Sequence, residues 1–337
     1  MPSTLQNKQS SRYLGPILGP LGAAVLLGSL YLFSLVLFSQ PFGYTQFLAI
    51  PFTVGFISAF ATSYYRAQSL SSAAFHGILA NFATWLIAFA AGTDAAISLS
   101  LSFPLVAILG CIGGLIGHST SRVFTRNLTK SITLGLACLA TPLLLVLEFS
   151  TEANPSLERI VSTIEIRSSP DLIWKQLISS SNLQVEDSSP EDSILPEPIS
   201  IQTNGSGVGA QRTSTLTTGH RYERIVEWNP GHLLRFDIVD QSLPIRDWSP
   251  YPETRDTIFR GFAQARAGQF RLIPVSPEVT RLESTTWYYH NRWPTAYWTS
   301  ISDRLIDHLQ DAFAERIKIA SEEEFESRSK TKQIALH

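Results

Sequence analysis

"NGSGVGAQRTSTLTTGHRYERIVEWNPGHLLRFDIVD", residues 204–240, contains three β-rich runs separated by turn residues. Runs of β-branched and aromatic residues bounded by Gly, Pro and Asn are typical of strands joined by short turns. Consecutive strands joined in this way pair as antiparallel hairpins. This part of the chain therefore predicts an antiparallel sheet.

The glycines that open this segment, Gly205, Gly207 and Gly209, are spaced G-x-G-x-G. A dinucleotide fingerprint needs G-x-G-x-x-G at the start of a helix, and a phosphate-binding P-loop needs a Lys followed by Ser or Thr. Neither pattern is present, and the residues that follow are not helical. We predict that the glycines form a tight turn or bulge at the entrance of a strand. We expect no nucleotide, nucleic acid or cofactor.

The flanking sequence extends the sheet and adds two helices. The short helix lies in SSPDLIWKQLISS (168–180), where Ser169 is a good N-cap and Pro170 suits the first helical position. A polar, Pro-rich loop is expected at 185–198. A long amphipathic helix is expected at 295–324, because apolar residues recur every three or four positions. Further strands are expected at 158–169, 257–264, 268–275 and 280–290.

This order of elements predicts an α+β domain in which a curved antiparallel sheet grips the long C-terminal helix. The sheet must bury one face, and only that helix is large enough to cover it.

The first half of the chain has a different composition. Residues 17–149 are rich in Leu, Ala, Ile, Phe and Gly and contain few charges. A membrane-spanning helix needs about 20 mostly apolar residues. We therefore predict an α-helical transmembrane bundle with five spans, at Ile17–Phe38, Phe47–Tyr64, Ala73–Ala91, Ala95–Ile116 and Ile132–Phe149.

The domain organisation follows from this division. We expect an N-terminal tail at 1–16, the membrane domain at 17–149, a linker at 150–157, the α+β domain at 158–322 and a polar tail at 323–337. Lys and Arg in the short loops all fall on one side if there are five spans, which places the N-terminus in the cytoplasm and the α+β domain outside it. An even number of spans would reverse the domain.

Two pairs of glycines in the fourth span, Gly110 with Gly114 and Gly113 with Gly117, have the small-xxx-small spacing that lets helices approach closely. They indicate packing within the bundle or a homodimer. Both cysteines, Cys111 and Cys138, lie in predicted spans, so the α+β domain has no disulfide and no cysteine-based metal site. No His-x-x-x-His pattern or carboxylate cluster suggests a metal.

The segments RIVSTIEIRSSPDLIWKQL, GSGVGAQRTSTLTTGHRYERIVEWNPGHLLRFDI and TRLESTTWYYHNRWPTAYWTSISDRLIDHL together resemble the SRPBCC or START-like superfamily. The resemblance is to its polyketide cyclase/dehydrase and lipid-transport group, and it covers about residues 157–322. It implies a helix-grip fold with a deep cavity that holds hydrophobic ligands such as lipids, sterols or polyketides. Some members are enzymes, and they share no catalytic motif that could be transferred to this chain.

Residues that could line such a cavity come from the strands and the long helix. On 279–291, alternation sets Trp287 and Tyr289 on one face and Tyr288 and His290 on the other, and either face could point inward. Arg212 could bind a ligand carboxylate, and we favour an ion pair with a neighbour such as Glu223 or Glu227. The candidates for the cavity are Arg212, Tyr222, Phe236, Trp287, Tyr289, Trp298, Ile301 and Leu305.

The leading hypothesis is a membrane-anchored protein that binds or handles a lipid or another hydrophobic ligand without obligatory chemistry. The first alternative is a cyclase or dehydratase that uses His290 with a neighbouring Tyr or Glu as acid–base groups. His220 and His232 fall at turns and are weaker candidates. The second alternative is an interaction module whose cavity is vestigial.

Overall fold

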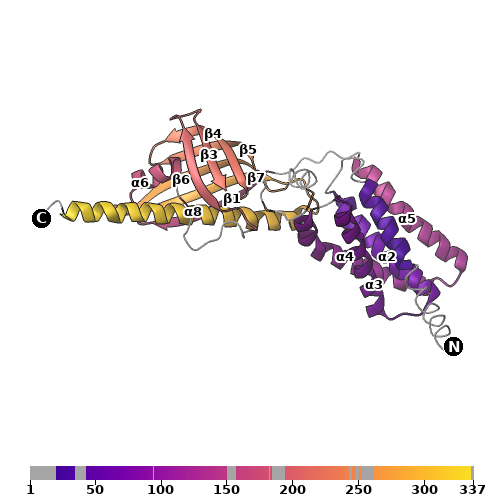
Figure 1. The fold of residues 1–337 in the computed structure, drawn as a ribbon. Coiled ribbons are helices and arrows are strands. Elements are labelled where there is room, and N and C mark those ends of the chain that lie inside the picture. The colour runs from indigo at the N-terminus through magenta and orange to yellow at the C-terminus, as the bar shows by residue number, and fades with distance from the viewer. Residues whose placement is uncertain are drawn as a thin grey trace, which may run out of the picture. The chain divides into compact units, whose positions relative to one another are not determined.

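The computed structural model describes residues 20–34, 43–93, 95–149, 157–181, 183, 194–242, 245–246, 250–251 and 262–334. The chain divides into two compact units. The first contains the apolar helices, and the second contains the sheet and the long C-terminal helix (Figure 1).

The first unit consists of helices that are long and apolar. Four of them are long and apolar enough to cross a membrane: η1 with α2 (Thr45–Ala49, Ile50–Tyr65), α3 (Leu70–Ala90), α4 (Ala96–Val123) and α5 (Asn127–Phe149). They coincide with four of the five predicted spans. The fifth, predicted at Ile17–Phe38, is described only as the shorter apolar helix Pro20–Ser34, and the rest of it lies outside the described residues.

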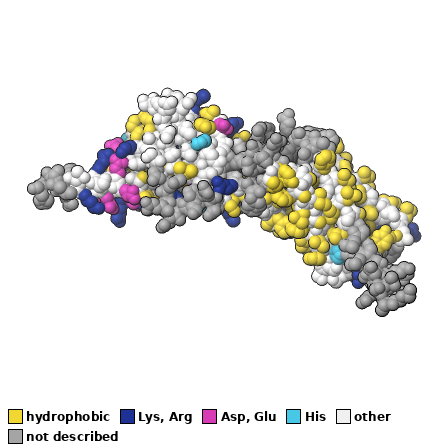
Figure 2. Space-filling view, viewed as in Figure 1, with side chains coloured by type: hydrophobic (Ala, Val, Ile, Leu, Met, Phe, Trp, Pro, Cys, Tyr) yellow, Lys and Arg dark blue, Asp and Glu magenta, His cyan; other side chains and the backbone are white. Residues whose placement is uncertain are grey.

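Hydrophobic side chains are exposed over these helices, as Figure 2 shows. Leu136, Leu139 and Leu143 of α5 are each more than 60 % exposed. Exposed leucines in such number are unfavourable in water but suit contact with lipid. Length, composition and surface are thus those of an integral membrane protein.

The glycines of α4 are packed inside this unit. A Cβ atom added at Gly113 or Gly117 would lie 2.2–2.3 Å from backbone oxygens of α2, and one added at Gly114 would lie 2.5 Å from a backbone oxygen of α3. The small-xxx-small spacing is therefore used between α4 and its neighbours in the bundle.

The second unit is built on a seven-stranded antiparallel sheet with the order β1-β7-β6-β5-β4-β3-β2. The strands are β1 (Glu158–Ile166), β2 (Pro198–Asn204), β3 (Gln211–Leu216), β4 (Gly219–Asn229), β5 (Leu233–Gln241), β6 (Gln264–Ser276) and β7 (Val279–Tyr289). Helix α6 (Pro170–Ile178) follows β1, and α8 (Thr295–Ile334) ends the unit. The sheet curls around α8 (Figure 1), which confirms the predicted helix-grip architecture.

The opening glycines lie in the turn between β2 and β3. Gly205, Gly207 and Gly209 all have φ between 83° and 92°, a region in which side chains other than glycine are strained. Their predicted role in a turn at a strand entrance is confirmed. Strand β2, which ends at Asn204, was not predicted, because it begins at Pro198, at the end of the polar, Pro-rich stretch that was expected to be a loop.

Strand β6 begins earlier than the strand predicted at 268–275. The strand predicted at 257–264 lies mostly outside the described residues, and β6 begins at Gln264. Gly268, which the sequence places at a strand start, lies inside β6. A Cβ at this position would lie 2.4 Å from the ring of Phe236, so glycine is required there by packing and does not break the strand.

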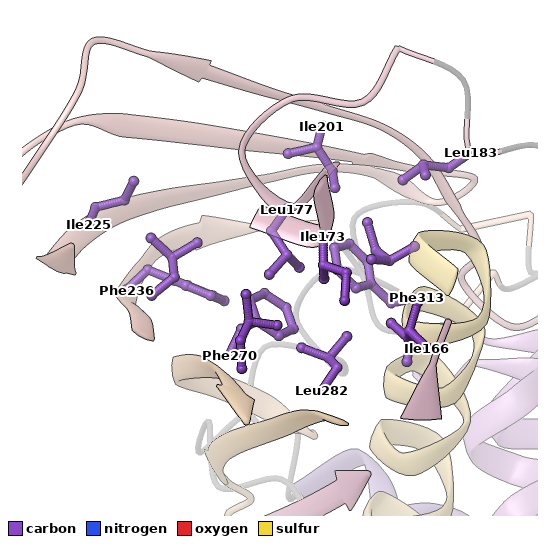
Figure 3. Packing of buried hydrophobic residues seen from close by; sticks show 14 of the residues in the cluster. Ile166, Ile173, Leu177, Leu183, Ile201, Ile225, Phe236, Phe270, Leu282 and Phe313 are labelled. Atoms are coloured by element: carbon purple, nitrogen blue, oxygen red, sulfur yellow. The ribbon is translucent and has the colours of Figure 1, made fainter. Parts of the chain in front are cut away.

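The inner face of the sheet, the face that contacts α8, carries the core. Ile166, Leu282, Phe270 and Phe313 point toward one another from β1, β7, β6 and α8 (Figure 3). Ile173 and Leu177 of α6 close the same cluster. Helix α8 continues to Ile334, through most of the stretch expected to be a polar tail.

Candidate ligand cavity

A cavity lies between the inner face of the sheet and α8. The space within it that the centre of a water molecule can occupy is about 70 Å³. A single water needs roughly 10–15 Å³ on this measure, so the cavity has room for several water molecules or a small ligand. Its lining is Pro196, Leu216, Arg221, Phe236, Ile238, Gln241, Ser242, Ala263, Ala265, Gly268, Phe270, Ser284, Thr285, Thr286, Leu305, Ile306, Leu309, Gln310 and Phe313.

Two polar atoms in this lining are buried without a hydrogen-bond partner among the described residues. They are Oγ of Ser284 on β7 and Oε1 of Gln310 on α8. The amide nitrogen of Gln310 donates to Thr286 Oγ1 at 2.6 Å, which leaves its oxygen as an acceptor. Buried polar atoms without partners cost free energy, roughly 1–3 kcal/mol each. The cavity, whose lining is mostly apolar, therefore offers places for a polar group.

Beside the cavity lies a buried ion-pair network centred on Glu223 of β4. Arg212 of β3 donates Nη1 to Glu223 Oε2, and its Nε donates to the carbonyl oxygen of Leu177 at 3.0 Å. Arg221 donates Nε to Glu223 Oε1 at 2.6 Å. Burial lowers the pKa of the Arg212 guanidinium, while the charge of Glu223 acts in the opposite direction. The predicted structural pairing of Arg212 with Glu223 is thus confirmed.

The Arg212 guanidinium also contacts the aromatic wall of the cavity. Its central carbon lies 5.2 Å from the ring centre of Phe236 and 5.6 Å from those of Phe270 and Phe313. Cation–π contacts of this kind strengthen when water is excluded, as it is here. Arg212 is not among the lining residues, so it supports the rings from outside the cavity.

Of the other predicted cavity residues, Phe236 and Leu305 line the cavity. Trp298 of α8 is fully buried, with its ring 5.8 Å from that of Phe262, and is not in the lining. Ile301 is half-buried and is also not in the lining.

Three predicted residues lie on the outer face of the sheet. Tyr222 is 46 % exposed. Trp287 and Tyr289 are half-buried, because Arg235 lies over the first ring and Arg266 over the second, each at 5.2 Å. On β7 it is the other alternating set that faces α8: Thr286 binds Gln310, and Tyr288 Oη donates to Asp303 Oδ1 at 2.5 Å.

The histidines do not enter the cavity lining. His290, the weak catalytic candidate, is only 5 % exposed, and its Nε2 lies 2.9 Å from Thr299 Oγ1. His220 and His232 are exposed. Acid–base catalysis needs a group within reach of a bound substrate, so this arrangement gives the enzyme hypothesis no support. Among the described residues no group of three or more His, Cys, Asp or Glu side chains comes together as a metal site.

Sequence reasoning missed Arg221, Phe270, Ser284, Gln310 and Phe313. Phe270 and Phe313 carry a usable signal, since both belong to predicted amphipathic elements. Ser284 and Gln310 carry none, because isolated polar residues on a strand or helix are usually exposed to solvent.

The antiparallel sheet, the long helix in its concave face and the cavity between them together define a helix-grip domain. The sequence matches no protein-family model and no curated protein. Among solved structures, the chain is similar to norcoclaurine synthase from Thalictrum flavum, with a bound transition-state analogue. The two share 14 % identity and a TM-score of 0.32, over 51 % of this chain and 99 % of that one. It is also similar to the Zhui aromatase/cyclase from a Streptomyces species, with 12 % identity and a TM-score of 0.32, over 52 % and 96 %. These likenesses concern the fold alone.

Proposed function

We propose that the helix-grip domain binds a small amphipathic ligand in the cavity between the sheet and α8, and that the apolar helices anchor this activity to a membrane. The observation that carries the proposal is the lining itself. Most of the lining residues are apolar or aromatic, and among the polar ones Ser284 Oγ and Gln310 Oε1 are buried without a hydrogen-bond partner in the described part of the chain. Ligand sites commonly combine an apolar wall with a few placed polar groups.

The size of the cavity restricts the ligand. About 70 Å³ of space for water centres suits a compact molecule or one end of a longer chain. A whole membrane lipid is too large for it. Binding or handling a small hydrophobic compound, without obligatory chemistry, fits the lining better than catalysis, because no histidine or carboxylate is among the described lining residues.

The side of the membrane is part of the proposal. With five spans, the positively charged loops face the cytoplasm and the helix-grip domain lies outside it. Reporter fusions at the C-terminus, one active only in the cytoplasm and one only outside it, test this placement. Activity of the cytoplasmic reporter would reverse it.

The ligand itself is tested by filling the cavity. Leu309 of α8 lines the cavity, whereas the preceding residue, His308, is exposed and serves as the control position. The full chain is purified as wild type, Leu309→Trp and His308→Trp, and small molecules that remain bound are identified by mass spectrometry. We expect at least one amphipathic compound in the wild type and His308→Trp that is several-fold depleted in Leu309→Trp. Identical profiles in all three proteins would overturn the proposal.

A further inference from the structure

The wall of the cavity carries an excess of positive charge. Arg221 is the one charged residue among the described residues of the lining. It shares the carboxylate of Glu223 with Arg212, so two guanidinium groups face a single carboxylate. The side chains of Arg212 and Glu223 are fully buried and that of Arg221 is 13 % exposed. One positive charge is therefore uncompensated within this network.

The hydrogen bonds of the network show where an anion could be received. Glu223 Oε2 accepts from Arg212, and Oε1 accepts from Arg221 and from Ser214 at 3.3 Å. Arg212 is enclosed by three phenylalanine rings and a backbone carbonyl, so a ligand cannot reach its charge directly. Arg221 uses its Nε on Glu223, and no hydrogen bond from its two terminal nitrogens is found among the described residues. These nitrogens are the accessible donors.

We infer that the ligand is an acidic amphiphile whose carboxylate binds the terminal nitrogens of Arg221 while its apolar part lies against Phe270, Phe313 and Leu309. A guanidinium matches a carboxylate with two parallel hydrogen bonds, and such charge-assisted pairs are stronger when partly desolvated. A cationic ligand would add a further positive charge to the wall, which is unfavourable at low dielectric. This inference rests on the proposed function, because it names the class of ligand for the same cavity.

The test compares an acid with its neutral counterpart. The full chain is reconstituted in nanodiscs of phosphatidylcholine, a zwitterionic lipid with no net charge. One of two probes is then added and the sample is irradiated with ultraviolet light. The first probe is a medium-chain carboxylic acid that carries a diazirine and an alkyne, and the second is the corresponding primary alcohol. Peptide mapping reports only the label on strands β4–β7 and on residues 305–313, so label from probe dissolved in the lipid is excluded. We expect the acid to label these peptides roughly tenfold more than the alcohol does.

Three variants assign the preference to one side chain. Arg221→Gln should bring the acid and the alcohol to equal labelling, and Arg221→Lys should restore most of the preference by restoring the charge. Arg224→Gln is the matched control, because Arg224 lies on the same strand, is exposed and lines no part of the cavity. It should retain the wild-type ratio.

The outcomes separate the inference from the proposed function. Equal labelling by acid and alcohol in the wild type overturns the inference and leaves a cavity that binds neutral amphiphiles. Labelling of these peptides by neither probe contradicts the proposed function itself. A preference for the acid that survives in Arg221→Gln also overturns the inference, since another group would then receive the carboxylate.

Discussion

Arg212 and Glu223 face each other across β3 and β4 and form an ion pair in which neither side chain is exposed to solvent. Removing one partner of such a pair leaves a buried charge without compensation, which costs about 3–5 kcal/mol. If Arg212 is removed, Glu223 keeps its ion pair with Arg221, which reduces the cost. If Glu223 is removed, Arg212 has no other carboxylate partner among the described residues.

Replacing Glu223 should therefore destabilise the helix-grip domain strongly. We expect Glu223→Gln to lower the free energy of unfolding by about 3 kcal/mol, measured by chemical denaturation of the full chain with tryptophan fluorescence. Glu227→Gln, on the same strand but exposed, should change it by less than about 0.5 kcal/mol. Equal small effects for both substitutions would show that the pair contributes little.

The hydrogen bond from Tyr288 to Asp303 joins β7 to the first turns of α8 at 2.5 Å. Tyr288→Phe should lower the free energy of unfolding by about 1–3 kcal/mol, because the acceptor is charged. Tyr289→Phe provides the control, since the next residue lies on the outer face. Burial, together with this bond, raises the pKa of Tyr288, so an alkaline titration followed by absorbance should show Tyr288 ionising only when the domain unfolds.

The close packing of α4 against α2 predicts a sharp difference between two glycines. A Cβ at Gly113 would meet a backbone oxygen of Phe52 at 2.2 Å, whereas one at Gly135 of α5 has no neighbour within 4 Å. Gly113→Ala should cost about 1–3 kcal/mol through overpacking. Gly135→Ala should be neutral or slightly stabilising, because alanine favours the helix. The two variants are compared by the fraction of protein that stays folded in detergent after heating, measured by gel filtration. Equal fractions would contradict close packing of α4 against α2 at Gly113.

Glu324 connects the C-terminal half of α8 to α6 by accepting hydrogen bonds from Lys175 at 2.8 Å and Gln176 at 3.0 Å. The bond from Lys175 is the largest cause of the lowered pKa of Glu324. A carboxyl whose folded pKa is lowered contributes stability that is fully present above its unfolded pKa, about 4.3, and is lost as pH falls through the folded value.

The stability difference between wild type and Glu324→Gln should accordingly depend on pH. We expect about 0.5–1 kcal/mol at pH 7, since Lys175 is largely exposed, and close to none at about pH 3. Thermal unfolding at a series of pH values measures the difference. Glu323→Gln, which changes an exposed neighbour, should show no such trend. A difference that grows as pH falls would contradict the assignment.

The sequence predicted the architecture because periodicity reports it directly. The spacing from Trp298 to Ile317 marks the buried face of α8, and hydropathy marks the four long apolar helices. The prediction failed where one residue type is compatible with two structures, a break between strands or a position inside a strand. Gly268 reads as a break between strands, yet it lies within β6 because Phe236 occupies the space of its side chain.

The cavity could be predicted only in part, because alternation identifies two faces of a strand without saying which is inside. Size pointed to Trp287 and Tyr289, but arginine side chains cover those rings on the outer face. The inner face of β7 carries the smaller Ser284 and Thr286 instead. Small side chains leave space that large ones would fill. The cavity therefore lies beside residues that give no recognisable signal in the sequence.

The position of α8 has a consequence for synthesis. The first strand of the domain is tied to its last helix, since the backbone nitrogen of Arg167 donates to Glu322 at 2.8 Å and Ser168 donates to the carbonyl oxygen of Ser321 at 3.3 Å. Until residues 295–322 have left the ribosome, the nascent sheet has no cover for Leu282 and Phe270, and the pairing of β1 with β7 joins strands that are distant in sequence. Partly folded chains with exposed apolar strands aggregate readily. The nascent domain therefore passes through a stage in which the apolar side chains that α8 later covers are exposed to solvent.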